Sequence, residues 1–337
     1  MKNNNYGHFT LTASAIATIL ALTACGGGGG SSSTAASTGA TGTTGATTST
    51  QTATSADVAT PVYAASSAQL AIFNTVNAYR QQCGFPTLTE NTTLDEAAQN
   101  HAIYMNDNGY AATDSEVSGN TGYTGANYVT RAIAAGYPTA ATTLGTWGGS
   151  TGGSGPLTAE QFGSMEANSW FSGVYHAGVL FNTGSIVGIG EDEASASGTT
   201  FSNADILVVQ NTGAIAHGPL TFPCQGVTGV PYDGLGESPT PPNVSVGGWG
   251  TPVLVEGNLT DIITLSSGTM TGPSGNVTLQ LLDSANDPNG ELKSYSAVAY
   301  PTSQLQPNTT YTVSITGTYN GTAFSRSFSF TTGSSQG

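Results

Sequence analysis

Hydrophobic residues spaced three or four positions apart predict four helices in the first half of the folded chain. Capping-box patterns at Thr93 and Thr158 indicate where two of them begin. Apolar runs at 186–189 and 206–209 predict two strands, and 214–222 is a third candidate. Because the helices precede the strands, an α+β fold is expected rather than βαβ units. The four helices are expected over residues 66–84, 93–108, 126–135 and 158–172.

Beyond residue 243 the helical period vanishes, and apolar residues alternate with polar ones over short runs. Asp287-Pro288-Asn289-Gly290 is a turn signal, and Asn320-Gly321 indicates a two-residue hairpin. So many short strands predict an all-β antiparallel sandwich over 243–334, with residues 335–337 as a tail. The Pro-rich residues 231–242 are interpreted as a semi-rigid linker. Strands are expected over residues 252–256, 261–266, 276–283, 294–300, 310–316 and 323–331.

The N-terminus has the layout of a secretion signal, because residues 1–24 combine a polar start with an apolar run too short to span a membrane. The run ends Leu22-Thr23-Ala24-Cys25, which resembles the lipobox of bacterial lipoproteins. The resemblance implies cleavage before Cys25 and a lipid (palmitate) anchor on it, and Gly26 then favours the outer membrane. The alternative is an ordinary signal peptide with a chance cysteine. Residues 25–61, rich in Gly, Ser and Thr, are expected to form a flexible tether.

Charge is scarce along the chain: charged residues make up 7% of the sequence, and the net charge is −15. The five basic residues are Lys2, Arg80, Arg131, Lys293 and Arg326. A surface that follows nucleic-acid phosphates needs clustered Lys or Arg, so nucleic acid is excluded as a partner, as is a polybasic contact with a membrane.

The cysteine count predicts one disulfide. If Cys25 carries lipid, Cys83 and Cys224 remain as an even pair in an oxidising compartment. A bond between them closes a loop of about 140 residues and contributes about 4–5 kcal/mol in the chain-entropy model.

Three stretches resemble the CAP superfamily of cysteine-rich secretory, antigen 5 and pathogenesis-related proteins (SCP-like). They are Phe73-Asn74 through His101 to Met105, Tyr123-Thr124-Gly125 through Arg131 to Tyr137, and Trp170 through His176 to Gly190. The segment 222–226 is similar to the closing segment of bacterial members. Together these stretches place the domain over 62–230. The resemblance implies an α-β-α sandwich with a cleft over the sheet, where two His and two acidic residues often hold a divalent metal.

This chain departs from that metal-binding pattern. His176 matches the later histidine, but Asp114 stands where the earlier one is expected. Thr146 and Gly173 occupy the two acidic positions. Glu166 shares a helix face with Trp170 and could replace a missing acid in the cleft. No cofactor is therefore expected; the alternative is zinc or another divalent ion held by His176, Asp114 and Glu166.

Other candidate residues have simpler interpretations. His101 lies on an apolar helix stripe and is expected to be a core histidine with a backbone or hydroxyl partner. Asp114 and Glu116 fall in a Gly/Ser-rich loop and are expected to be solvated. Arg131 is expected to pair with a helix carboxylate. The glycine-dense residues 147–155 lack a following lysine and are interpreted as a mobile loop.

The C-terminal segment 305–313 resembles a corner of bacterial immunoglobulin-like and fibronectin type III-like modules, in which Tyr311 would bond back to the backbone. The sequence favours an exported, lipid-anchored CAP protein, facing periplasm or surface, that binds an amphiphile such as a fatty acid or sterol, or a partner protein. One alternative is a metal-assisted hydrolase or peptidase using His176 with Asp114 or Glu166. Another is a structural adhesin. No Gly-x-Ser-x-Gly elbow, His-Glu-x-x-His motif or phosphate loop occurs.

Overall fold

The computed structural model describes residues 56–139 and 146–337. The signal segment 1–24, the lipidation candidate Cys25 and most of the tether lie outside these ranges, as does the side chain of Thr146. None of the helices in the described ranges is both long and apolar enough to cross a membrane.

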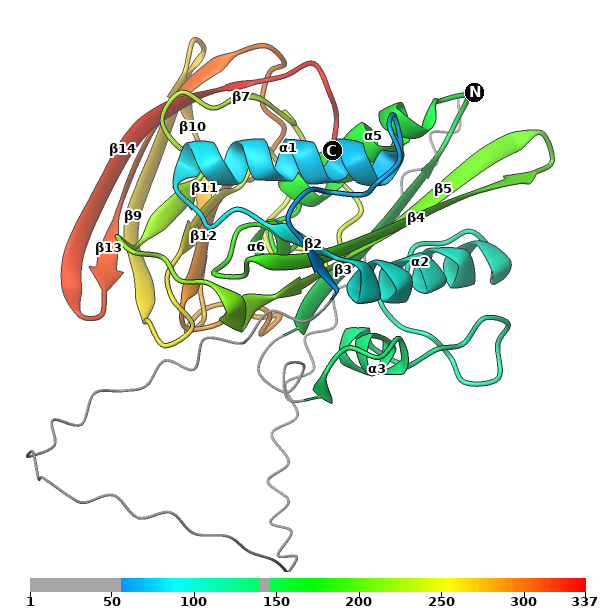
Figure 1. Cartoon of the computed structure of the whole chain (residues 1–337). Coiled ribbons are helices and arrows are strands. Elements are labelled where there is room, and N and C mark those ends of the chain that lie inside the picture. The colour runs from blue at the N-terminus through cyan, green and yellow to red at the C-terminus, as the bar shows by residue number, and fades with distance from the viewer. Residues whose placement is uncertain (1–55, 140–145) are drawn as a thin grey trace, which may run out of the picture.

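A five-stranded mixed sheet forms the centre of the N-terminal half (Figure 1). Its neighbouring strands pair antiparallel except β2 with β4, which run parallel. In spatial order the strands are β1 (Asp57–Val58), β2 (Thr89–Asn91), β4 (Ile186–Ala196), β5 (Thr199–Val209) and β3 (Thr146–Ser154).

Helices cover both faces of this sheet, so the α+β class and the expected layering are observed (Figure 1). Alternate residues of β5 explain the layers, because successive side chains of a strand point to opposite faces. Ile206 and Val208 face α1 (Ala68–Cys83), α5 (Ala159–Ser172) and the short α6 (Ala177–Leu180). Leu207 and Val209 pack against α2 (Thr92–Asp107) and α3 (Tyr128–Ala134).

The helix ends follow the predictions with one exception. Thr158 and Gln161 form the expected reciprocal capping box at the start of α5. The capping box predicted at Thr93 is wrong, because α2 begins two residues earlier. Its cap is Asn91, whose Oδ1 accepts from the backbone N–H groups of Thr93 and Leu94 at 3.1 Å each. An asparagine at this position satisfies the same free N–H groups that a threonine would.

The glycine-dense segment predicted as a mobile loop is instead the edge strand β3, paired with β5 along its whole length. The glycines are required by close approach rather than by flexibility. A Cβ on Gly148 would lie 2.5 Å from Tyr128 Cδ1, and one on Gly163 of α5 would lie 2.3 Å from the carbonyl oxygen of Ala68. Glycine lets side chains and backbone from neighbouring elements come this close.

The C-terminal half consists of two sheets, and a strand is present at each expected place. Two strands run further than expected, to Gly272 and Tyr319, and the strand expected over 276–283 is divided in two at residue 278. Asn320 and Gly321 form the expected tight hairpin, with φ of 52° and 77°. Gln306 N–H donates to Tyr311 Oη at 2.8 Å, which confirms the expected corner. One sheet orders β10 (Gly275–Val277), β9 (Ile263–Gly272), β13 (Thr310–Tyr319), β14 (Thr322–Thr332) and β7 (Thr228–Val230); the other orders β11 (Leu279–Asp283), β12 (Ser296–Pro301), β8 (Val253–Glu256) and β6 (Leu220–Phe222).

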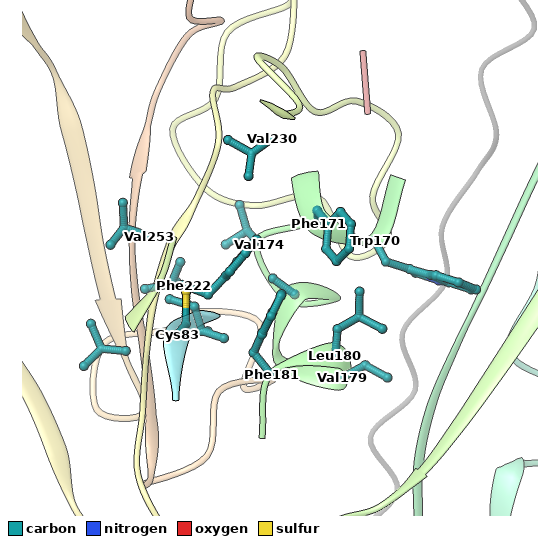
Figure 2. Close-up of a cluster of buried hydrophobic side chains, with 14 of the residues drawn as sticks. Cys83, Trp170, Phe171, Val174, Val179, Leu180, Phe181, Phe222, Val230 and Val253 are labelled. Carbon is teal, nitrogen blue, oxygen red and sulfur yellow. The ribbon is translucent and has the colours of Figure 1, made fainter. Parts of the chain in front are cut away.

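The two halves interlock where a linker between separate domains was expected. Strands β6 and β7, which precede residue 231, pair with β8 and β14 of the C-terminal sheets. The predicted disulfide Cys83–Cys224 is confirmed and ties the end of α1 to the residues after β6. Phe181 and Phe222 stack at 3.6 Å between ring centroids. One continuous hydrophobic core therefore runs from α1 and α5 into the C-terminal strands, as Figure 2 shows around Cys83, Phe222 and Val253.

Candidate functional site

The turn between α5 and α6 carries His176, and a glutamate from the C-terminal half holds it. The side chain of His176 is fully buried, and its Nδ1 lies 2.8 Å from Glu237 Oε1. The same carboxylate accepts from three successive backbone N–H groups: Val174 at 2.8 Å, and Tyr175 and His176 at 2.9 Å. Four donors on one carboxylate fix the orientation of the imidazole ring.

Glu237 takes the space that an acidic side chain would need at position 173. A Cβ on Gly173 would lie 2.8 Å from Glu237 Oε1 and 2.7 Å from His176 Cβ. The glycine at this position therefore leaves room for a carboxylate that arrives from a distant segment. Residues 206–255 contain two charged residues, Asp233 and Glu237. A glutamate in a Pro-rich stretch with only one other charged residue, Asp233, is the sequence signal that could have marked it.

Asp114 lies at the free edge of β3 and is buried, so its predicted solvation is wrong. Its Oδ1 accepts from the N–H of Ser150 at 2.9 Å. Burial raises the pKa of Asp114 to about 6, although the neighbouring His176 opposes the rise. Burial alone would lower the pKa of His176, but the hydrogen bond to Glu237 and the charges of Glu237 and Asp114 leave that pKa raised. The structure thus brings Asp114 near His176, since Asp114 contacts Ser150 and the preceding Gly149 lies beside the His176 ring.

Arg131 pairs with a carboxylate as expected, but the partner belongs to a strand rather than a helix. Its Nη2 lies 3.5 Å from Asp205 Oδ2 of β5, and both side chains are fully buried. Its Nη1 donates to the carbonyl of Asp114 at 2.9 Å, and its guanidinium lies 4.9 Å from the ring centroid of Tyr128. Arg131 therefore holds the Asp114 backbone in place, and Asp114 in turn contacts the edge of β3.

His101 is the expected core histidine with the expected backbone partner, and it contacts a glutamate as well. Its Nε2 lies 2.6 Å from the carbonyl of Thr113, and its Nδ1 lies 3.0 Å from Glu116 Oε1. Glu116 is itself buried, which contradicts its predicted solvation, and accepts from the N–H groups of Thr124 and Gly125. The pair closes the loop between α2 and α3.

Glu166 does not join His176. Its Oε1 accepts from Ser202 Oγ at 2.6 Å, toward the far end of β5. Ser202 is four residues from Ile206, whose strand partner is Gly149, beside His176. At about 3.4 Å per residue this separation is about 14 Å. Within residues 56–139 and 146–337, no group of three His, Cys, Asp or Glu side chains is arranged to hold a metal ion.

A shallow pocket lies on another surface, beside the disulfide, and combines basic and apolar groups. Arg326 reaches it from β14, with Nη2 donating to the carbonyl of Pro219 at 2.8 Å. Its lining residues are Cys83, His217, Pro219, Leu220, Thr221, Cys224, Gln225, Arg326, Ser327 and Phe328.

The comparison with protein families agrees with this geometry. The model of the cysteine-rich secretory protein family, CAP, matches residues 73–182, from α1 to the turn after α6. This stretch is a CAP domain. Its matched region includes Asp114 and His176 but ends before Glu237. No curated protein matches the chain.

Proposed function

We propose that this CAP protein is a lipid-anchored, envelope-exposed binding module rather than an enzyme. The observation that carries the proposal is the burial of the turn between α5 and α6, where solvent does not reach the side chain of His176. His176 and Asp114 are fully buried, and Glu237 holds His176 from outside the CAP domain. A general base has to reach the proton it abstracts, and a buried, clamped imidazole is placed to stabilise the fold instead.

The anchoring part of the proposal rests on the sequence before residue 56. A lipobox-like Cys25 followed by a Gly-rich tether would hold the folded part at a distance from the outer membrane. Radiolabelled palmitate supplied to expressing cells is expected to label the full chain and not Cys25→Ser. Equal labelling of both proteins would refute the anchor.

An amphiphile with an anionic head is the ligand class favoured by the pocket beside the disulfide. Arg326 and His217 are two of the few basic side chains in a chain of net charge −15, and Leu220 and Phe328 add apolar surface. Native mass spectrometry of Cys25→Ser protein with long-chain fatty acids is expected to show a bound lipid, and Arg326→Gln is expected to lose it. Absence of any adduct at high micromolar lipid would leave a partner protein as the ligand.

The hydrolase alternative keeps one favourable observation, because Asp114 and His176 are neighbours. It requires a divalent-metal-dependent activity that His176→Ala abolishes without unfolding the protein.

The adhesin alternative draws on the C-terminal sheets, which we propose to be immunoglobulin-like. An antibody that blocks this half would test it. Loss of attachment without an effect on lipid binding would favour the adhesin.

A further inference from the structure

Glu166 and Glu191 lie on either side of one serine hydroxyl, inside the layer between α5 and the sheet. Ser202 Oγ is 2.6 Å from Glu166 Oε1 and 2.5 Å from Glu191 Oε1. Glu166 is fully buried, Glu191 is 8% exposed and Ser202 is fully buried. The second oxygen of Glu166, Oε2, has no hydrogen-bond partner among the described residues.

The number of available protons determines whether Glu166 and Glu191 can both be ionised. A serine hydroxyl has one proton and can donate to one carboxylate at a time. If both glutamates were ionised, the other contact would place an anionic oxygen against a lone pair at about 2.5 Å, which is repulsive. If one carboxyl keeps its proton, it donates to Ser202 Oγ, and Ser202 donates onward to the other. Both short contacts are then hydrogen bonds.

Among the described residues, no positive charge faces the pair to replace that proton. From β4, Glu193 and Asp192 add negative charge near Glu191 and Glu166. From β3, Thr151 lies on the same face of the sheet, across from Ala204. The basic residue of α1, Arg80, donates to carbonyls at the other end of the helix. The surroundings therefore favour a neutral carboxyl.

We propose that Glu166 and Glu191 share one proton through Ser202 near neutral pH, and that this pair is a pH-sensitive element that holds α5 on the sheet more firmly in acid than in alkali. Burial raises the pKa of Glu191 to about 7 and that of Glu166 well above its usual range, in agreement with the geometry.

The sign of the pH effect follows from linkage. A carboxyl whose pKa is higher in the folded chain than in the unfolded chain binds its proton more tightly when folded. Its contribution to stability is complete below the ordinary pKa of 4.5 and is lost as the pH rises through about 7. An envelope protein meets the pH of its surroundings directly, so the CAP domain would be most rigid in mildly acidic ones.

Urea unfolding of the full chain at about pH 5 and about pH 8 tests the proposal. Glu166→Gln and Glu191→Gln each supply a permanent N–H in place of the shared proton, so each is expected to unfold near the wild-type midpoint at the lower pH. Between the lower and the higher pH, the folding equilibrium constant of every protein is compared. The decrease in the wild type is expected to be about tenfold or more larger than the decrease in either variant. Glu160→Gln changes an exposed residue of the same helix and is the matched control. Its stability is expected to differ between the two pH values by as much as that of the wild type.

Infrared spectroscopy provides a second readout that does not depend on stability. The band of a protonated carboxyl at neutral pH is expected to decrease by one carboxyl equivalent in Glu166→Gln or in Glu191→Gln. An unchanged band in both variants, or a wild-type pH dependence of unfolding in both, would overturn the shared proton.

Discussion

Two buried histidines of this protein contact a glutamate through Nδ1, and the two glutamates come from different distances along the chain. Glu116 is 15 residues from His101, whereas Glu237 is 61 residues from His176. Both carboxylates also accept from backbone N–H groups of a turn: Thr124 and Gly125 in the first case, and residues 174–176 in the second. The chemistry is the same, but the first pair closes a loop inside the CAP domain and the second joins it to the C-terminal half.

The difference teaches that the C-terminal half is part of how this CAP domain is built. The local pair needs only residues within the match to the CAP family, whereas the long-range pair needs a residue beyond it. The following predictions separate the two roles, in order of decreasing effect.

Removing residues 231–337 is expected to have the largest effect, because it deletes Glu237 and the strand partners of β6 and β7 together. Phe222 and Val230, now fully buried, would face water. The expected result is loss of cooperative urea unfolding and of the near-UV circular dichroism of buried aromatic rings. A truncated chain that still unfolds cooperatively would show that the CAP domain is independent of the C-terminal half.

Glu237→Ala leaves buried N–H groups and His176 without this acceptor, which is expected to cost about 3–5 kcal/mol of unfolding free energy. Glu237→Gln keeps one acceptor oxygen and should cost about 1–3 kcal/mol. Chemical denaturation measures both. Equal, negligible losses in the two variants would mean that Glu237 only fills space.

Glu116→Ala is expected to cost about 2 kcal/mol, because hydrogen bonds to a charged group contribute roughly this much and the loop can open locally. Amide hydrogen exchange should then speed up at Thr124 and Gly125 and stay unchanged at residues 174–176. Glu237→Ala should give the reverse pattern. Faster exchange at both places in both variants would contradict the separation of the two pairs.

The pairs are also expected to respond to pH in opposite directions. Burial alone would raise the pKa of Glu116, but its hydrogen bonds to His101, Thr124 and Gly125 lower it below the ordinary 4.5, so its contribution is present above that pH and is lost in acid. The raised pKa of His176 means that its contribution is complete below the ordinary 6.5 and is lost in alkali. The loss caused by Glu116→Gln should therefore shrink at low pH, and that caused by Glu237→Gln should shrink at high pH. Parallel pH profiles of the two variants would contradict this assignment.

The third described histidine provides the smallest effect and the control. His217 is exposed, so His217→Ala is expected to change the unfolding free energy by less than about 0.5 kcal/mol. A larger change, measured in the same urea experiment, would mean that the pocket beside the disulfide contributes to stability.

Local patterns determined much of this protein in advance. The four helices, the strands of the C-terminal half and the Asn320-Gly321 hairpin follow from spacing and turn chemistry that act over a few residues. The Cys83–Cys224 bond followed from the pair of cysteines that remains once Cys25 is set aside as the lipidation candidate, and the CAP match follows from short stretches in the right order.

Only the tertiary structure decided which residues that are distant in sequence contact one another. β3 is a strand because Tyr128 and β5 pack against it, although its glycines favour a loop when read alone. Glu237 replaces an acid missing at Gly173, and Glu166 finds Glu191 through Ser202 rather than His176. In each case the partner lies far away in sequence, and burial of a polar or charged group, which has no local signature, selects the pairing.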